Sequence, residues 1–218
     1  LTTTLIVYSG ENFQMDLAFY NSAFNDANDP ELTLGKINML TKNGVSTGND
    51  SKPNFSLLGD PALKLNYPKY NVTATHINNI DINQFVDTLK ALSEVKISGV
   101  VSDKNGNVLK GFNGYVYPTV YDKPAIVFTQ NNDGGVVQKF SYNNKILFKG
   151  KASVQNGMFQ FTFPMPYDIN YSVDNARVSF YATSGSDDAH GSNESFLVGG
   201  SVPNADLNQI GPKIRLFM

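Results

Sequence analysis

ILFKGKASVQNGMFQFTFP, residues 146–164, is the stretch of sequence that decides the fold. Apolar and polar residues alternate on both sides of Asn156-Gly157, a pair typical of the tight turn between two antiparallel strands. The residues expected to point inward are Ile146, Phe148, Ala152 and Val154 before the turn, and Phe159, Phe161 and Phe163 after it. The stretch therefore predicts a β-hairpin with one buried face.

The same two-residue period continues on either side of this hairpin. Val95, Ile97 and Val101 alternate with more polar neighbours, and residues 103–107 (DKNGN) predict a hairpin turn into the next strand. Further strand candidates are residues 178–182, 196–198 and 214–216, with a polar loop expected at 184–193 and a looser connector at 200–211. Many short strands with no helix between them predict a mainly β fold, a β-sandwich from residue 67 onward.

Residues 1–65 follow a helical period instead. A short β-branched run at 2–7 is followed by Phe13, Leu17, Tyr20 and Phe24, whose spacing of four, three and four predicts one buried helical face. A second helix is expected to begin at Asp29-Pro30-Glu31, to bury Leu34, Ile37 and Leu40, and to end at Gly44. Residues 55–58 predict a buried strand that Gly59-Asp60-Pro61 closes.

The N-terminal part therefore looks like an incomplete α/β layer. It lacks the strands that would cover the face formed by residues 13–24. We expect this face to pack on the sandwich, on a second copy of the chain, or on a separate fragment. The division expected is 1–66 for the α/β part and 67–218 for the sandwich.

Composition excludes several classes of protein. The chain has 218 residues, with 17 Lys and Arg against 19 Asp and Glu, a net charge of -2 and no basic block, which argues against nucleic acid as a partner. No apolar run is long enough for a membrane helix. There is no cysteine, which excludes disulfides, thiolate metal sites and thiol nucleophiles. Because the chain starts without Met and within a strand pattern, we expect a fragment of a longer protein.

Candidate catalytic residues are few. His76 and His190 are the only histidines, so a serine triad would need one of them. No Gly-x-Ser-x-Gly motif accompanies either residue, and a structural or exposed role is the simpler interpretation.

Two clusters offer oxygen atoms to a metal ion. Asp187, Asp188 and Asn193 have the hard ligands that Ca²⁺ prefers, although solvated loop residues are the commoner explanation. Asp103, Asn105 and Asn107 are weaker candidates because the run lacks the distal Glu of a calcium-binding EF-hand loop. We therefore predict no metal, no cofactor and no catalytic residue in this chain.

Two further motifs have a structural and a functional interpretation. Gly59-Asp60-Pro61 is expected to be a structural turn. The alternating Tyr115, Tyr117 and Tyr121 form either an aromatic face for a sugar or, as the favoured interpretation, part of the core with their hydroxyls at its edge.

Several motifs resemble one known family. Residues 54–68 (NFSLLGDPALKLNYP) resemble the end of the peptidase domain in gingipain-type cysteine peptidases. One branch of that family, the sortases of the type IX secretion system, is similar along the rest of the chain. The matching stretches are 87–92 (DTLKAL), an Ile-x-Gly-x-Val strand at 97–101, 112–122 (FNGYVYPTVYD), 148–164, 168–171 (DINY) and 211–216 (GPKIRL).

The resemblance implies a cell-surface, outer-membrane enzyme of Gram-negative bacteria, with a caspase-like α/β domain followed by an immunoglobulin-like β-sandwich. Such enzymes remove C-terminal signal domains from type IX cargo and attach the cargo to surface lipopolysaccharide. Their Cys thiolate, activated by a His, lies upstream of Leu1 in the family pattern, so no catalytic residue is carried over to this chain.

The partners implied are the upstream peptidase domain, type IX cargo and the secretion machinery, with dimer or fragment packing through residues 13–24. The alternative is a free-standing adhesin or carbohydrate-binding sandwich. Residues 1–65 count against that alternative because such a module has no place for their α/β motifs. An enzyme with an oxygen nucleophile is a remote third possibility.

Overall fold

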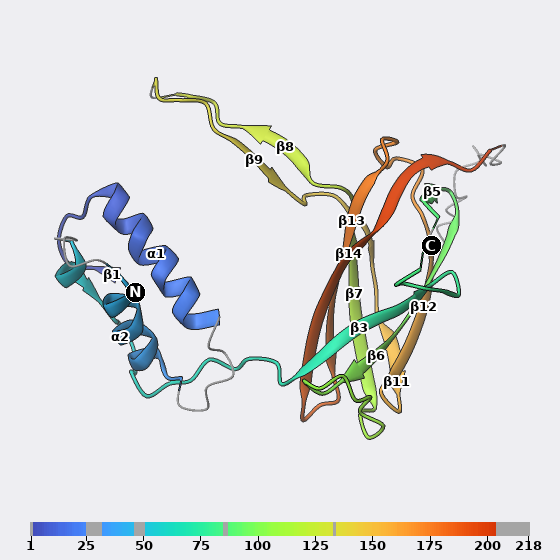
Figure 1. The fold of residues 1–218 in the computed structure, drawn as a ribbon, viewed down its shortest axis with the longest axis horizontal. Coiled ribbons are helices and arrows are strands. Elements are labelled where there is room, and N and C mark those ends of the chain that lie inside the picture. The colour runs from blue at the N-terminus through green and yellow to red at the C-terminus, as the bar shows by residue number, and fades with distance from the viewer. Residues whose placement is uncertain (1, 25–31, 46–50, 85–86, 133, 204–218) are drawn as a thin grey trace, which may run out of the picture. The chain divides into compact units, whose positions relative to one another are not determined.

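The computed structural model describes residues 2–24, 32–45, 51–84, 87–132 and 134–203. The chain divides into two compact units, Leu1–Tyr67 and Pro68–Met218, which we call the N-terminal and C-terminal units. Figure 1 shows helices in the first unit and strands in the second. The prediction of a mainly β chain is confirmed. No helix among the described residues has the length and apolar character needed to cross a membrane.

The N-terminal unit contains helix α1 (Ser9–Phe24), helix α2 (Leu34–Gly44) and a short 3₁₀ turn, η1 (Lys52–Asn54). Strand β1 (Thr2–Thr3) pairs antiparallel with β2 (Phe55–Ser56). Two small apolar clusters hold it together. One contains Met15, Val45 and Phe55, and the other contains Ala23, Leu32 and Ile37.

Helix α1 buries a different face from the one its spacing predicts. Phe13, Leu17, Tyr20 and Phe24 are 68%, 53%, 61% and 56% exposed, whereas Met15 and Ala23 are 1% and 0% exposed. The reason is that α1 is apolar on two faces. A row at a spacing of four, which runs through Met15, Phe19 and Ala23, packs inside the unit. The second row stays mostly exposed, although the ring of Phe24 meets the ring of Tyr67 edge-on at 6.1 Å.

Helix α2 ends at Gly44 and buries Ile37 completely, as predicted. It begins later than expected, because the hydroxyl of Thr33 caps it by accepting a 3.2 Å hydrogen bond from the backbone N–H of Lys36. The expected start at residues 29–31 lies outside the described residues.

The described residues of the C-terminal unit form twelve strands. They are β3 (Tyr70–Ile77), β4 (Ile80–Asp81), β5 (Leu89–Ala91), β6 (Glu94–Ser102), β7 (Gly114–Tyr121), β8 (Ala125–Phe128), β9 (Lys139–Tyr142), β10 (Ile146–Lys149), β11 (Ala152–Gln155), β12 (Met158–Pro164), β13 (Asp174–Thr183) and β14 (Asp188–Ser201). Strands β3, β6, β12, β11, β7, β13 and β14 are neighbours in that order, and β14 pairs with β3 to close the circuit. All of these pairings are antiparallel except β14 with β3.

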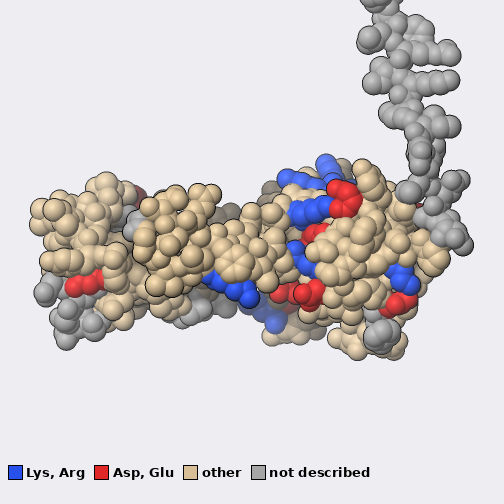
Figure 2. Space-filling model, turned by 90° about the horizontal axis from the view of Figure 1, so that it is seen from above, with Lys and Arg blue, Asp and Glu red and all other residues tan. Residues whose placement is uncertain are grey.

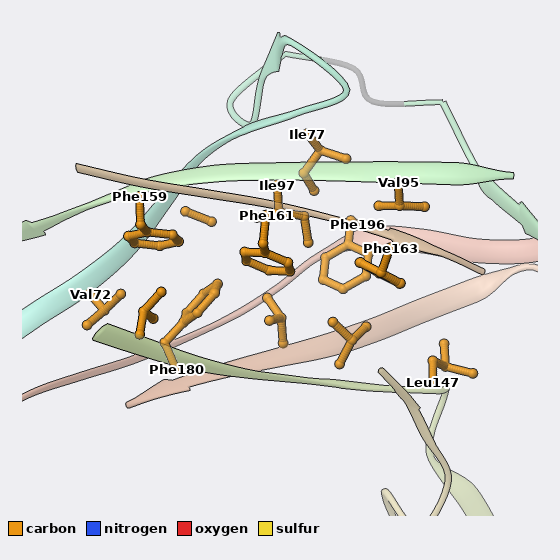
Figure 3. Packing of buried hydrophobic residues seen from close by; sticks show 14 of the residues in the cluster. Val72, Ile77, Val95, Ile97, Leu147, Phe159, Phe161, Phe163, Phe180 and Phe196 are labelled. Atoms are coloured by element: carbon orange, nitrogen blue, oxygen red, sulfur yellow. The ribbon is translucent and has the colours of Figure 1, made fainter. Parts of the chain in front are cut away.

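The core lies between two facing layers of this circuit. Figure 3 shows Val95 and Ile97 of β6 and the three phenylalanines of β12 pointing toward Phe180 of β13 and Phe196 of β14. Phe159, Phe161 and Phe163 are 4%, 8% and 1% exposed. The hairpin predicted from residues 146–164 is confirmed for β11 and β12, with Asn156 and Gly157 both at positive φ in the turn.

The first half of that stretch differs from the prediction. It forms two short strands, β10 and β11, which both pair with β7, and an irregularity in register lies between Ile146 and Phe148. As a result Ile146 is 50% exposed, and Leu147 is buried in its place.

Strands β6 and β7 do not form the expected hairpin. The turn at residues 103–107 is present, and Ser102 still forms a bridge with Val108. The chain then crosses to the opposite layer. The side chain of Phe112 is buried in the core on the way, and this burial stabilises the crossing. Strand β7 pairs with β10, β11 and β13 instead.

The polar segment 184–193 is mostly strand. Strand β14 begins at Asp188, so only residues 184–187 form the loop. Small residues on the inner side make this possible. Ala189 is fully buried, and a Cβ on Gly191 would lie 1.8 Å from the carbonyl oxygen of Val72. The connector expected at 200–211 and the strand expected at 214–216 lie outside the described residues apart from residues 200–203.

Candidate functional site

The C-terminal unit presents an exposed group of tyrosines, which we call the tyrosine face: Tyr115 and Tyr117 of β7, Tyr181 of β13, and Lys151 beside them. The three rings are 46%, 36% and 43% exposed. Tyr117 and Tyr181 are directly opposite in the β7–β13 ladder, and their ring centroids are 6.2 Å apart at an angle of 30°. The Lys151 ammonium lies 3.7 Å from the centre of the Tyr115 ring.

This arrangement corrects the favoured interpretation of the tyrosines as core residues. The inner side of β7 is filled by Val116 and Val120, both fully buried. Successive residues of a strand point to opposite faces, so Tyr115 and Tyr117 must lie on the outer face. Tyr121 shares their parity, and its side chain is partly buried.

A carboxylate fixes one ring of the tyrosine face. The Tyr181 hydroxyl donates a 2.9 Å hydrogen bond to Asp188 Oδ1, and this bond raises the pKa of Tyr181 above its ordinary value. Chemically, the face offers flat rings for stacking, hydroxyls for hydrogen bonds and one cation.

The two histidines lie on different strands, His76 on β3 and His190 on β14. His76 lies on β3 with Nδ1 3.0 Å from the hydroxyl of Thr75, and it lines an open groove of about 690 Å³ together with the amide side chains of Gln155 and Gln160. His190 lies on β14, opposite Tyr181. Across the described part of the chain, no three His, Asp or Glu side chains come together in a way that could hold a metal ion.

The calcium candidates are engaged in other contacts. Asp187 pairs with Lys69 at 3.2 Å, and Asp188 binds Tyr181. The side-chain oxygen of Asn193 accepts hydrogen bonds from the backbone and hydroxyl of Ser195. The three residues therefore do not converge on one ligand position.

Asp103 organises the turn after β6. Its carboxylate accepts hydrogen bonds from the side chain and backbone of Asn107 at 3.0 and 2.9 Å, and from the backbone of Asn105 at 2.8 Å. The bonds from Asn107, followed by those from Asn105 and Gly106, hold the pKa of Asp103 below its ordinary value. These bonds form the turn that residues 103–107 predict.

Gly59-Asp60-Pro61 caps helix α2. The backbone N–H groups of Gly35 and Leu34 donate to the carbonyl oxygens of Pro61 and Leu63 at 2.9 and 2.8 Å. These are two of the N–H groups that the first turn of a helix leaves without an internal partner. The carboxylate of Asp60 stabilises the turn itself by accepting from the backbone of Ala62.

A buried ion pair was missed by the sequence analysis. Asp122 and Lys123 follow β7, their charged atoms are 2.8 Å apart, and both side chains are 4% exposed. The Lys123 ammonium also donates to the carbonyl oxygens of Asn170 at 2.7 Å and Val198 at 3.2 Å. Burial raises the pKa of Asp122, but the hydrogen bonds from Lys123 and Asn170 outweigh it and leave the pKa below its ordinary value. The only signal in the sequence was two opposite charges at the end of an apolar strand.

Residues 1–66 match the model of peptidase family C25. The chain is also similar to the crystal structure of dimeric latent PorU from Porphyromonas gingivalis, with 29% identity over 81% of this chain and a TM-score of 0.58. It spans only 17% of that PorU chain. The resemblance to gingipain-type peptidases and to PorU is therefore confirmed.

Other solved structures are less similar. Spo0M, a sporulation control protein from Bacillus subtilis, is 14% identical over 62% of this chain and 51% of its own, with a TM-score of 0.35. The C-terminal domain of wzt is 13% identical over 66% of this chain and 81% of its own, with a TM-score of 0.29. Neither score is high enough to indicate a shared fold. A comparison with curated proteins gives no match.

Proposed function

We propose that this chain is the non-catalytic C-terminal region of a cell-surface cysteine peptidase, the sortase of a type IX secretion system. The observation that carries the proposal is where the two matches lie. The C25 match ends at residue 66, beside the end of the N-terminal unit at Tyr67. Because the PorU match covers 81% of the chain, it includes most of the C-terminal unit as well.

In this proposal, residues 1–66 are the C-terminal end of a caspase-like α/β peptidase domain, and residues 67–218 are an immunoglobulin-like β-sandwich. The two facing layers of largely antiparallel strands around one core support the second assignment. The two helices and the short β1–β2 pair support the first.

The chain would support the peptidase domain or position it, because it contains no cysteine to act as a thiolate nucleophile. The thiolate and its histidine would come from an upstream peptidase domain. The parent enzyme would remove C-terminal signal domains from type IX cargo at the outer membrane and attach the cargo to lipopolysaccharide, so that cargo and secretion components would be its partners.

The exposed face of α1 supports an upstream partner. Phe13, Leu17, Tyr20 and Phe24 are each more than half exposed, and Tyr20 and Phe24 stack at 6.0 Å. On the side drawn in Figure 2 the N-terminal unit shows few charged side chains. A contiguous apolar surface of this kind marks an interaction site. We propose that the upstream domain, or a second copy, covers it.

The first test compares the purified chain with the full-length protein on a cargo signal domain. The chain alone should give no cleavage, and adding the upstream region as a separate polypeptide should restore binding and activity. Leu17→Lys should block that restoration, because it places a charge in the α1 face, whereas Met39→Lys, an equally exposed position on α2, should not. Turnover by the chain alone would refute the proposal.

A second candidate function is carbohydrate binding, and the tyrosine face favours it. Exposed rings at 6.2 Å beside an ammonium group can stack on the apolar side of a sugar ring. In a polysaccharide binding assay, Tyr117→Ala and Tyr181→Ala should each lose affinity, while Tyr167→Ala, an exposed tyrosine elsewhere, should not. Equal binding by all three variants would remove this candidate.

A further inference from the structure

Strands β3, β6, β12 and β11 lie side by side in one layer of the C-terminal unit (Figure 1). The open groove that His76 lines is on the outer face of this layer, and its volume of about 690 Å³ is typical of a ligand-binding cleft. None of the residues of the tyrosine face lines it. The groove is therefore a separate surface, with a ligand independent of the functions proposed above.

Pairing between the strands arranges the outward side chains of the groove in two rows. In the first row, Met158 lies opposite Val100 on one side and Gln155 on the other. In the second row, Gln160 lies opposite Ser98. Each row runs across the strands, and the spacings between four strands, about 4.8 Å each, add up to about 14 Å. An extended chain covers this distance with about four residues.

The groove is lined by polar side chains that include no carboxylate, ammonium or guanidinium group. Among the described residues that form it, none is Asp, Glu, Lys or Arg. Its one phenyl ring, that of Phe159, is only 4% exposed because it belongs to the core. A phosphate or carboxylate group therefore finds no cation here, and a sugar ring finds no exposed aromatic ring to stack on. These properties favour a neutral ligand held by hydrogen bonds.

Three side-chain amides line the groove: those of Gln155 on β11, Asn156 in the following turn, and Gln160 on β12. Each amide has N–H donors and a carbonyl acceptor, the same groups that a peptide bond presents. Within the described residues, no protein group is hydrogen-bonded to the Gln155 and Asn156 amides, and all three residues are exposed. The Gln160 carbonyl oxygen accepts only a long bond, 3.5 Å, from the Ser98 hydroxyl. The amides are therefore open to the backbone of a bound peptide.

The strands beneath the groove have no free edge. Gly99 of β6 pairs with Ala74 of β3 on one side and with Phe159 of β12 on the other, and Phe159 pairs in turn with Val154 of β11. A peptide cannot join the sheet here as an added strand, so its backbone needs side-chain partners instead. Between the amides and β3, Met158 is 58% exposed and offers a flexible apolar surface to one side chain of the peptide.

We propose that this groove binds an extended, uncharged peptide segment. About four residues of the segment lie across the four strands. Its backbone N–H and C=O groups bond to the amides of Gln155 and Gln160, and one apolar side chain near its middle rests on Met158.

The test uses a phage-displayed library of random heptapeptides, selected on the full chain and depleted on a double variant, Gln155→Leu with Gln160→Leu. Leucine keeps much of the volume of the side chain and removes its hydrogen bonds. Synthetic copies of the enriched peptides are then titrated by calorimetry. They should carry no net charge and have an apolar residue near the middle. The double variant should bind them about tenfold more weakly, because two neutral hydrogen bonds are lost.

Two matched variants should bind these peptides as the unmodified chain does. Gln14→Leu makes the same change at an exposed glutamine of helix α1, and Tyr117→Ala alters only the tyrosine face. Circular dichroism of each variant verifies that the strands are still folded.

Four results would overturn the proposal. The first is a selection that enriches no peptide, and the second is equal affinity of the peptides for the unmodified chain and the double variant. The third is enrichment of charged peptides, or of peptides whose binding is lost with Tyr117→Ala. The fourth is a neutral glucan, dextran, that binds the unmodified chain but not the double variant while no peptide binds, which would assign the groove to sugars.

Discussion

The buried pair of Asp122 and Lys123 gives the most demanding prediction. Lys123→Met keeps the apolar stem of the side chain but removes the ammonium group that lies 2.8 Å from the carboxylate and bonds to Asn170 and Val198. Asp122 would keep its two backbone donors and lose its counter-ion. Breaking a buried pair from one side costs about 3–5 kcal/mol, because the remaining charge stays desolvated. We expect that loss in the free energy of unfolding of the C-terminal unit.

The assay is urea denaturation followed by far-ultraviolet circular dichroism, since the chain has no tryptophan to report by fluorescence. Asp122→Asn and the double variant with Lys123→Met complete a double-mutant cycle, in which the coupling between the two residues should exceed roughly 0.5 kcal/mol. The unmodified chain and Lys123→Met should differ less in free energy of unfolding as pH falls through the lowered pKa of Asp122. Protonation of the Asp122 carboxylate removes the ion pair from the unmodified chain. If Lys123→Met lowers the free energy of unfolding by less than about 1 kcal/mol, the claim that this variant leaves Asp122 as an unpaired buried charge is wrong.

Three other changes test separate parts of the structure. Gly191→Ala places a Cβ 1.8 Å from the carbonyl oxygen of Val72 and should lower the stability of the C-terminal unit by about 1–3 kcal/mol in thermal unfolding, whereas Gly111→Ala, with no neighbour within 4 Å, should have little effect. Asp103 has a folded pKa below its ordinary value of 3.8, so its contribution to stability is present above that value and is lost as pH falls through the folded pKa. Asp103→Ala should therefore reduce the loss of unfolding free energy that the unmodified chain shows as the solution is made acid. The same loss in both proteins would contradict the hydrogen bonds described for the Asp103 carboxylate. Thr33→Ala removes the cap of α2 and should lower the stability of the helix by about 1 kcal/mol. In urea denaturation, the helical circular dichroism signal should then be lost at a lower urea concentration.

The sequence predicted the structure best where a residue pattern is compatible with a single local conformation. The alternating phenylalanines of β12 and the Asn156-Gly157 turn have few other ways to fold, and both predictions held. Tyr115 and Tyr117 were predicted on the wrong face because Val116 and Val120 follow the same two-residue period on the opposite face of the strand. Alternation shows that a strand has two faces, but large amphipathic side chains do not show which face is inside.

The errors in topology have a different cause. The crossing from β6 to β7 depends on Phe112 packing in a core that forms from distant strands, so the turn at 103–107 could not reveal it. Residues 188–193, the first part of strand β14, were predicted as a loop because their polar residues face outward and their inner residues are small. In the candidate site, the cross-strand contact of Tyr117 with Tyr181 depends on a pairing that no local pattern contains.

The parallel pairing of β14 with β3 sets the order in which the C-terminal unit can fold. Tyr70 and Asn71 meet Ala189 and His190, which are far later in the chain. Contacts between residues so distant in sequence form slowly, because the entropy cost of closing a long loop comes before any favourable contact is made. During synthesis or export from the N-terminus, β14 becomes available to pair with β3 only when nearly the whole unit has emerged. Until β14 has formed, this end of β3 is paired with β6 alone.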